Sequence, residues 1–192
     1  MKTTQHFEKL SKETRDLIVM ASENRKAQDQ AVVQKLNIEE NRSRIYELIG
    51  KNIILKVLLP KGTRDEDINA LIDLDGIEYF PKLYAYEEGK YLFMEKAQGV
   101  SLPDFIRLAE DNELDNIKRL LLDALGKMID RKRYDWDFKL EHIFWSRENK
   151  KLTWIDFSIC ETYSTPYPSK KEVLEEFEQY FKKELRFYGR KI

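Results

Sequence analysis

Two aspartates, Asp137 and Asp156, occupy positions from which a carboxylate could be presented to a ligand. Asp156 directly follows residues 152–155, a short apolar and aromatic run that predicts a strand. Residues 143–145 predict a second strand, and the polar residues 146–151 predict the turn between the two. Such a hairpin would bring the two carboxylates close together. Paired carboxylates at strand ends could bind a divalent cation and accept a proton from a hydroxyl.

The order of these residues, D-x-K-x-x-H-I-F-W, then a turn, then W-I-D-F-S, resembles a known pattern. It is similar to H-R-D-x-K-x-x-N and D-F-G, the catalytic loop and metal-binding triplet of the protein-kinase superfamily. The resemblance implies that Asp137 orients or deprotonates an acceptor hydroxyl and that Asp156 binds the Mg²⁺ bridging the phosphates of ATP. It also implies that Lys139 stabilises charge on the transferred group, as in Ser/Thr-type protein kinases.

The chain departs from the family pattern at several positions. His142 stands where the family usually has a magnesium-binding asparagine, and imidazole is a poorer ligand than oxygen for this cation. A histidine here also occurs in the lipopolysaccharide heptose-kinase branch of the superfamily. Asp135 replaces the histidine of H-R-D, a largely structural position, and Ser158 replaces the glycine of D-F-G. Residues 37–43, expected to cover the phosphates, contain no glycine, so the nucleotide would be held differently or less well.

Ahead of these motifs, residues 44–49 and 53–58 predict two strands of an antiparallel meander joined by a Gly-Lys-Asn turn. In the kinase superfamily a lysine on the third strand of such a meander pairs with the phosphates, and Lys56 in I-I-L-K-V-L matches it. The alternative is a lysine that snorkels from a sheet edge. The helix predicted at 65–74 places Asp67 where the family has the glutamate that pairs with this lysine. The alternative for Asp67 is an acid that only complements the helix dipole.

Residues 79–86 and 91–102 resemble the fourth and fifth strands and the hinge of kinases, often L-V-M-E-Y-x-x-G-x-S-L. The resemblance puts Met94 at the gatekeeper position, and Glu95 with Ala97 on the hinge whose backbone binds adenine. The alternative is a hairpin followed by a helix that Ser101 caps.

Helical periodicity marks the two ends of the chain and its centre. Residues 3–34 and 114–129 each predict a helix, and so does the segment from about 169 to 187. The first helix is expected to pack on a lobe, with a protein-binding role as the alternative. Because so few residues follow Cys160, the pattern resembles the minimal C-terminal lobes of RIO-type and KEOPS-complex kinases or of lipopolysaccharide kinases. The basic ending around residues 186–191 is similar to that of the KEOPS kinase.

The composition bounds the remaining possibilities. The 192 residues are 42% hydrophobic and 36% charged with a net charge of −1, so nothing argues for nucleic acid or a membrane surface. No apolar run approaches the roughly 20 residues of a spanning helix, and no signal region precedes residue 9, so a cytoplasmic location is expected. A single cysteine and two histidines argue against a disulfide framework or a zinc site, whereas the 35 acidic residues leave magnesium open.

The sequence therefore predicts an α+β, two-lobed, protein-kinase-like fold. Its parts would be an N-terminal helical extension (1–31), a β-rich N-lobe (32–97) and a truncated helical C-lobe (98–192). The expected activity is Mg-dependent transfer of the ATP γ-phosphate to a hydroxyl, as in an atypical Ser/Thr-type protein kinase, on a protein or a small molecule.

Three alternatives stay open. One is a saccharide or lipopolysaccharide-type kinase, and another is a generic α+β domain whose motifs match by chance. The third is a pseudokinase that acts as a regulatory or nucleotide-binding module, against which the retention of Lys56, Asp137, Lys139 and Asp156 argues.

Overall fold

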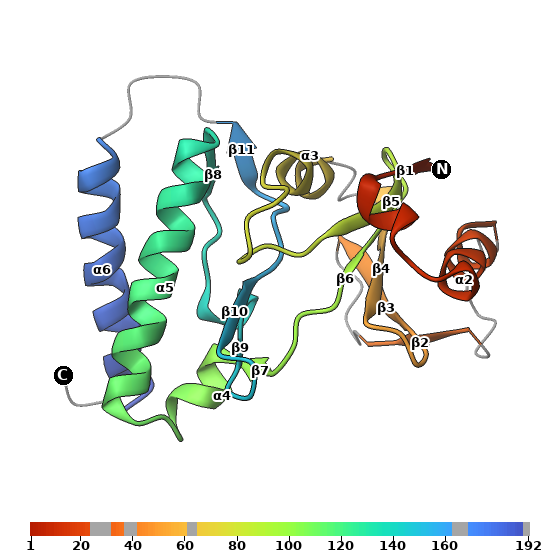
Figure 1. Ribbon diagram of the computed structural model, residues 1–192. Coiled ribbons are helices and arrows are strands. Elements are labelled where there is room, and N and C mark those ends of the chain that lie inside the picture. Colours follow the sequence, from red (N-terminus) through yellow and green to blue (C-terminus); the bar gives the residue numbers. More distant parts are fainter. Residues whose placement is uncertain (24–31, 37–41, 61–64, 163–168, 190–192) are drawn as a thin grey trace. The chain divides into compact units, whose positions relative to one another are not determined.

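The computed structural model describes residues 1–23, 32–36, 42–60, 65–162 and 169–189 (Figure 1). The chain forms two compact units. Unit 1 consists of Met1–Gly76 and Pro81–Lys96, and unit 2 consists of Ile77–Phe80 and Ala97–Ile192. The residues expected to form a separate N-terminal extension are grouped with the sheet in unit 1, and the later division falls between Lys96 and Ala97.

Unit 1 is built on a six-stranded antiparallel sheet. Its strands, in spatial order, are β1 (Lys2–Thr3), β5 (Leu83–Glu87), β6 (Tyr91–Glu95), β4 (Ile53–Leu58), β3 (Ser43–Leu48) and β2 (Val33–Lys35). Strand β4 lies inside the sheet, and five of its six residues are buried, as expected for a strand covered on both faces.

The two faces of β4 carry different residues because side chains alternate along a strand. Ile53 and Leu55 belong to a hydrophobic cluster with Phe7 and Ile18 from two N-terminal helices, α1 (Gln5–Glu8) and α2 (Lys12–Glu23). Lys56 therefore points to the opposite face, which carries α3 (Glu66–Asp73).

The single helix predicted for residues 3–34 is wrong. Residues 2–3 pair with β5 as a strand, and the chain breaks between α1 and α2. Side-chain caps explain the interruption: Thr4 accepts a hydrogen bond from the His6 N–H (3.2 Å), and Ser11 accepts one from the Thr14 N–H (3.2 Å). Residues 24–31 lie outside the described residues, and Val33–Lys35 form β2.

Unit 2 contains two small sheets and two long helices. Its strands are β7 (Val100–Ser101), β8 (Arg133–Asp135), β9 (Ile143–Ser146), β10 (Lys151–Trp154) and β11 (Cys160–Thr162), arranged as β10-β9-β7 and β11-β8. Its helices are α4 (Leu102–Ile106), α5 (Asp111–Asp130), the short 3-10 helix η2 (Leu140–His142) and α6 (Lys170–Phe187).

Helices α5 and α6 lie side by side (Figure 1). Both have a buried apolar stripe, and both begin with a capping box, formed by Glu110 with Glu113 and by Ser169 with Glu172. The aromatic core of the unit includes Trp154 and Phe157, which are almost completely buried.

Residues 79–82, predicted as part of a strand, lie outside β5. Tyr79 belongs to unit 2 instead, where its hydroxyl donates to Asp123 (2.7 Å) and its carbonyl accepts from the Trp154 N–H (2.9 Å). Burial and the neighbouring Asp123 carboxylate raise the pKa of Tyr79. Tertiary contacts with α5 and β10 thus override the local strand preference of this segment.

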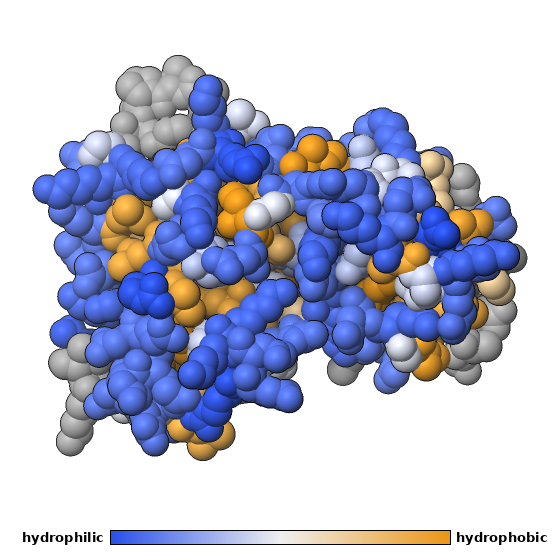
Figure 2. Space-filling view, viewed as in Figure 1, coloured by the Kyte–Doolittle hydropathy of each residue, from blue (hydrophilic) through white to orange (hydrophobic). Residues whose placement is uncertain are grey.

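The exterior is mainly polar. Most of the face shown in Figure 2 is hydrophilic, and its hydrophobic residues gather in small areas. Within the described part of the chain, no helix has the length and apolar character needed to cross a bilayer.

Candidate functional site

Lys56 and Asp67 form a buried ion pair in unit 1. The Lys56 Nζ lies 2.8 Å from an Asp67 carboxylate oxygen, and the two residues are 6% and 3% exposed. Lys56 cannot snorkel from a sheet edge, because β4 is hydrogen-bonded to β3 on one side and to β6 on the other. Removing two charges from water costs several kcal/mol per ion, on the order of what their attraction returns. Such a pair is weak evidence for stability, so a role in ligand binding is the use to test.

The predicted hinge residues lie along one continuous segment. Met94 is buried in β6, and Glu95 ends that strand, with its N–H donating to the Lys82 carbonyl (2.8 Å). Ala97 begins the next stretch of unit 2. Two residues later, Gly99 has φ +89°, and a Cβ there would lie 2.0 Å from the Trp145 carbonyl oxygen. The glycine of the hinge pattern is therefore required by close backbone approach to β9.

Asp137 and Lys139 form the exposed pair of the loop that follows β8. Lys139 Nζ donates to the Asp137 carboxylate at 2.9 Å. Their side chains are 34% and 51% exposed, so both could contact a ligand. Between them, Phe138 turns inward and packs against Trp154 and Phe177, with ring centroids 4.8 and 4.6 Å apart. The loop thus has a half-buried aromatic anchor and a partly exposed carboxylate beside an ammonium group.

Asp135, the last residue of β8, holds this loop through a hydrogen bond to its backbone. It is 4% exposed and accepts two hydrogen bonds, from the Asp137 N–H (3.0 Å) and from the Trp154 indole N–H (3.2 Å). Burial raises the pKa of Asp135 to about 6, although the two hydrogen bonds oppose the shift, and the charges of Asp156 and Asp137 add to it. The sequence identified only a replaced histidine here. The aspartate two residues before Asp137, together with a tryptophan on the following hairpin, was the available signal for this support.

Asp156 lies just beyond β10 in a left-handed backbone conformation, with φ +64°. This conformation costs about 1–2 kcal/mol for most residues, though aspartate tolerates it better, and it is a feature of functional sites. The Asp156 carboxylate lies 3.6 Å from His142 Nε2, and the Ile155 N–H donates to the His142 carbonyl (2.9 Å). The hairpin therefore brings the two predicted metal ligands together.

The donor set suits a cation that arrives with its own ligands. Among the residues the structure describes, no group of three or more His, Cys, Asp or Glu side chains could hold a metal. Mg²⁺ is commonly bound through one or two carboxylates together with substrate phosphates and water. Asp156 fits that mode, with His142 as its neighbour.

Some of the predicted features cannot be compared with the structure. Most of the glycine-free loop (37–41) and the end of the basic tail (190–191) fall outside the described residues. A cavity of about 310 Å³ opens in unit 2 beside Tyr79, Leu120 and the turn between β9 and β10, and no predicted site residue lines it.

The structure is similar to that of the Cydia pomonella granulovirus kinase PK-1, with a TM-score of 0.58, 20% sequence identity and 78% of this chain covered. The chain spans 60% of the length of that kinase chain. No protein-family model matches the sequence. A search of curated proteins also gave no match.

The fold is therefore protein-kinase-like: α+β, with a β-rich N-terminal part and helices later in the chain. This confirms the fold class predicted from the sequence. The atypical branch of the superfamily stays a prediction.

Proposed function

We propose that the protein is a phosphotransferase that moves the γ-phosphate of ATP to a hydroxyl group with Mg²⁺. The observation that carries the proposal is the buried ion pair of Lys56 and Asp67. In kinases a strand lysine held by a helix acid binds the nucleotide phosphates. A pair at the positions expected from the sequence, in a protein with this fold, supports the same use here.

The roles of the other residues follow from their chemistry. The acceptor oxygen would attack the γ-phosphorus as the bond to the β,γ-bridging oxygen breaks, and ADP would leave. The hydroxyl proton would pass to the exposed carboxylate of Asp137, while Lys139, 2.9 Å away, would balance charge on the transferred group. Asp156 and His142 would hold Mg²⁺, which when bound neutralises phosphate charge.

For the acceptor, we propose a protein Ser or Thr hydroxyl. The basis is Lys139, which stands where Ser/Thr-type protein kinases have a lysine and contacts Asp137 directly. A saccharide hydroxyl is the alternative that an acceptor screen would distinguish.

Thermal unfolding with and without Mg-ATP tests the proposal. A ligand present at a hundredfold excess over its Kd adds about 2.7 kcal/mol to stability. For a chain of this length we expect the midpoint to rise by roughly 5–10 °C. Asp156→Asn should abolish the magnesium-dependent part of the shift. The matched control is Asp115→Asn, which changes a carboxylate of α5 that is 81% exposed and should leave the shift intact.

The outcomes separate the candidate functions. Absence of any shift at millimolar Mg-ATP would rule out the proposed nucleotide site. A shift that Asp156→Asn loses, without phosphate transfer to any protein or saccharide acceptor, would identify a pseudokinase.

A further inference from the structure

The first residues of the chain form an N-terminal arm, residues 2–8, that is attached to strand β5. Lys2 and Thr3 pair with Tyr86 and Ala85 as the edge strand of the sheet. Thr4 continues the attachment, because its N–H donates to the Tyr84 carbonyl at 3.0 Å. Phe7 then enters the hydrophobic cluster of unit 1. The arm is therefore part of the folded sheet.

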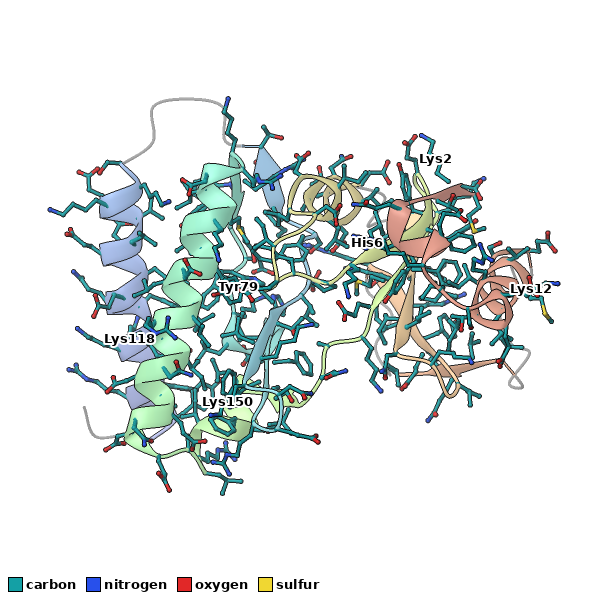
Figure 3. All side chains as sticks on the ribbon, in the orientation of Figure 1. Lys2, His6, Lys12, Tyr79, Lys118 and Lys150 are labelled. Carbon is teal, nitrogen blue, oxygen red and sulfur yellow. The ribbon has the colours of Figure 1, made fainter. Side chains whose placement is uncertain are left out.

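From this attachment the arm reaches the end of helix α3. Gln5 Nε2 donates to one oxygen of the Asp75 carboxylate (2.9 Å), and His6 Nε2 lies 2.5 Å from the other. His6, which belongs to α1, is labelled in Figure 3. The His6 side chain is 14% exposed and that of Asp75 is 34% exposed. Burial alone would raise the pKa of Asp75, but the hydrogen bonds from His6 and Gln5 outweigh it and hold that pKa below its usual value. Two adjacent residues of α1 thus contact both oxygens of the Asp75 carboxylate.

Asp75 lies two residues beyond the end of α3, the helix that carries Asp67. Helix α3 ends at Asp73, Leu74 caps it through hydrogen bonds to its last turn, and Asp75 comes next. The helix also packs against β5, the strand to which the arm is paired. Any shift of α3 along or away from the sheet would change the 2.8 Å contact between Asp67 and Lys56. The arm is therefore placed to fix this helix against the sheet.

We propose that the N-terminal arm positions α3, and with it the ion pair of Lys56 and Asp67, through the contacts of Gln5 and His6 with the Asp75 carboxylate. His6 and Asp75 are positioning residues in this account, since they act on the phosphate-binding lysine through the helix. The expected effect on ATP rests on the proposed function, whereas the effect on α3 does not.

Hydrogen exchange of the ligand-free protein tests the structural half. His6→Ala and Asp75→Asn should speed exchange of the amides in the last turn of α3 by about tenfold, the change expected when a hydrogen bond to a charged group is lost. The matched control is Lys2→Ala, which removes the arm's exposed ion pair with Glu88 and leaves both contacts with Asp75 in place. His6→Gln keeps a donor at similar reach and should restore most of the protection. Unchanged exchange in α3 would overturn the proposal.

Mg-ATP affinity tests the functional half. His6→Ala should weaken binding severalfold in the wild-type background and have no further effect in a Lys56→Met background, because the arm acts through that lysine. An equal loss in both backgrounds would show that the arm does not act through the ion pair, and would overturn the proposal. If the wild type binds no Mg-ATP, the proposed function fails, and hydrogen exchange alone decides whether the arm positions α3.

Discussion

At the scale of single residues, Asp135 makes the stability of the loop that carries Asp137 depend on pH. Its pKa of about 6 in the folded protein lies above the value of roughly 3.9 expected in the unfolded chain. The folded state therefore binds the extra proton between these values. The contribution of Asp135 to stability is full below about pH 4 and is lost as the pH rises through about 6.

Asp135→Asn should remove this pH dependence. Between pH 4 and pH 7 the free energy of unfolding of the wild type should fall relative to the variant by up to about 3 kcal/mol, since each pKa unit corresponds to about 1.36 kcal/mol. Urea denaturation at several pH values measures the difference, and Asp115→Asn is again the exposed control. Parallel stability curves for wild type and Asp135→Asn would contradict this prediction, because they would show that the pKa of Asp135 does not change on folding.

The sequence predicted which candidate site residues pair with each other, but it did not predict the buried Asp135 that holds the loop between them and β8. The resemblance to kinases implied a pairing of Lys56 with Asp67 and a shared metal-binding role for His142 and Asp156, and the structure places these pairs 2.8 and 3.6 Å apart. The burial of Asp135 could not be predicted in this way. It depends on an indole from a separate strand, and tertiary contacts of that kind leave no periodic signal in the sequence.

At the scale of elements, the approach of β7 to β9 depends on Gly99. Its φ of +89° is unfavourable for an L-residue, and an added Cβ would lie 2.0 Å from the Trp145 carbonyl oxygen. Gly99→Ala must therefore push β7 away from β9, in addition to the cost of about 1–2 kcal/mol for the left-handed backbone.

We expect Gly99→Ala to lower the thermal midpoint by more than Gly89→Ala does. Gly89 also has a positive φ, +68°, but open space surrounds its Cβ position, so this control isolates the backbone cost from the steric clash. Differential scanning fluorimetry of the two variants measures both. Equal midpoints would show that β7 moves freely and that the hinge glycine has no packing role.

The elements themselves followed from the sequence where one periodicity dominates. Strand β4 was predicted with its observed bounds, and the helix predicted at 114–129 extends over Asp111–Asp130. Prediction failed where short polar contacts decide the structure. The cap at Ser11 divides the N-terminal helix, and β1 is a strand only because β5 supplies its partner.

At the scale of the whole molecule, the chain passes repeatedly between its two units. Residues 77–80 follow α3 closely and belong to unit 2, where Phe80 packs edge-on against Phe157 with centroids 5.7 Å apart. Lys56 belongs to unit 1, and Asp156 belongs to unit 2. The proposed function requires that both residues act on the same nucleotide. Their effects on the affinity for Mg-ATP should then depend on each other, which binding measurements can test.

A double-mutant cycle supplies that measurement. The Kd for Mg-ATP would be determined for the wild type, Lys56→Met, Asp156→Asn and the double variant by isothermal calorimetry. Residues that share a ligand couple by about 0.5–3 kcal/mol, whereas independent sites add to within roughly 0.5 kcal/mol. We expect coupling, because Lys56 and the cation held by Asp156 would neutralise the same phosphates. Additive losses would mean that the two residues do not act on one nucleotide, even if each variant alone weakens binding.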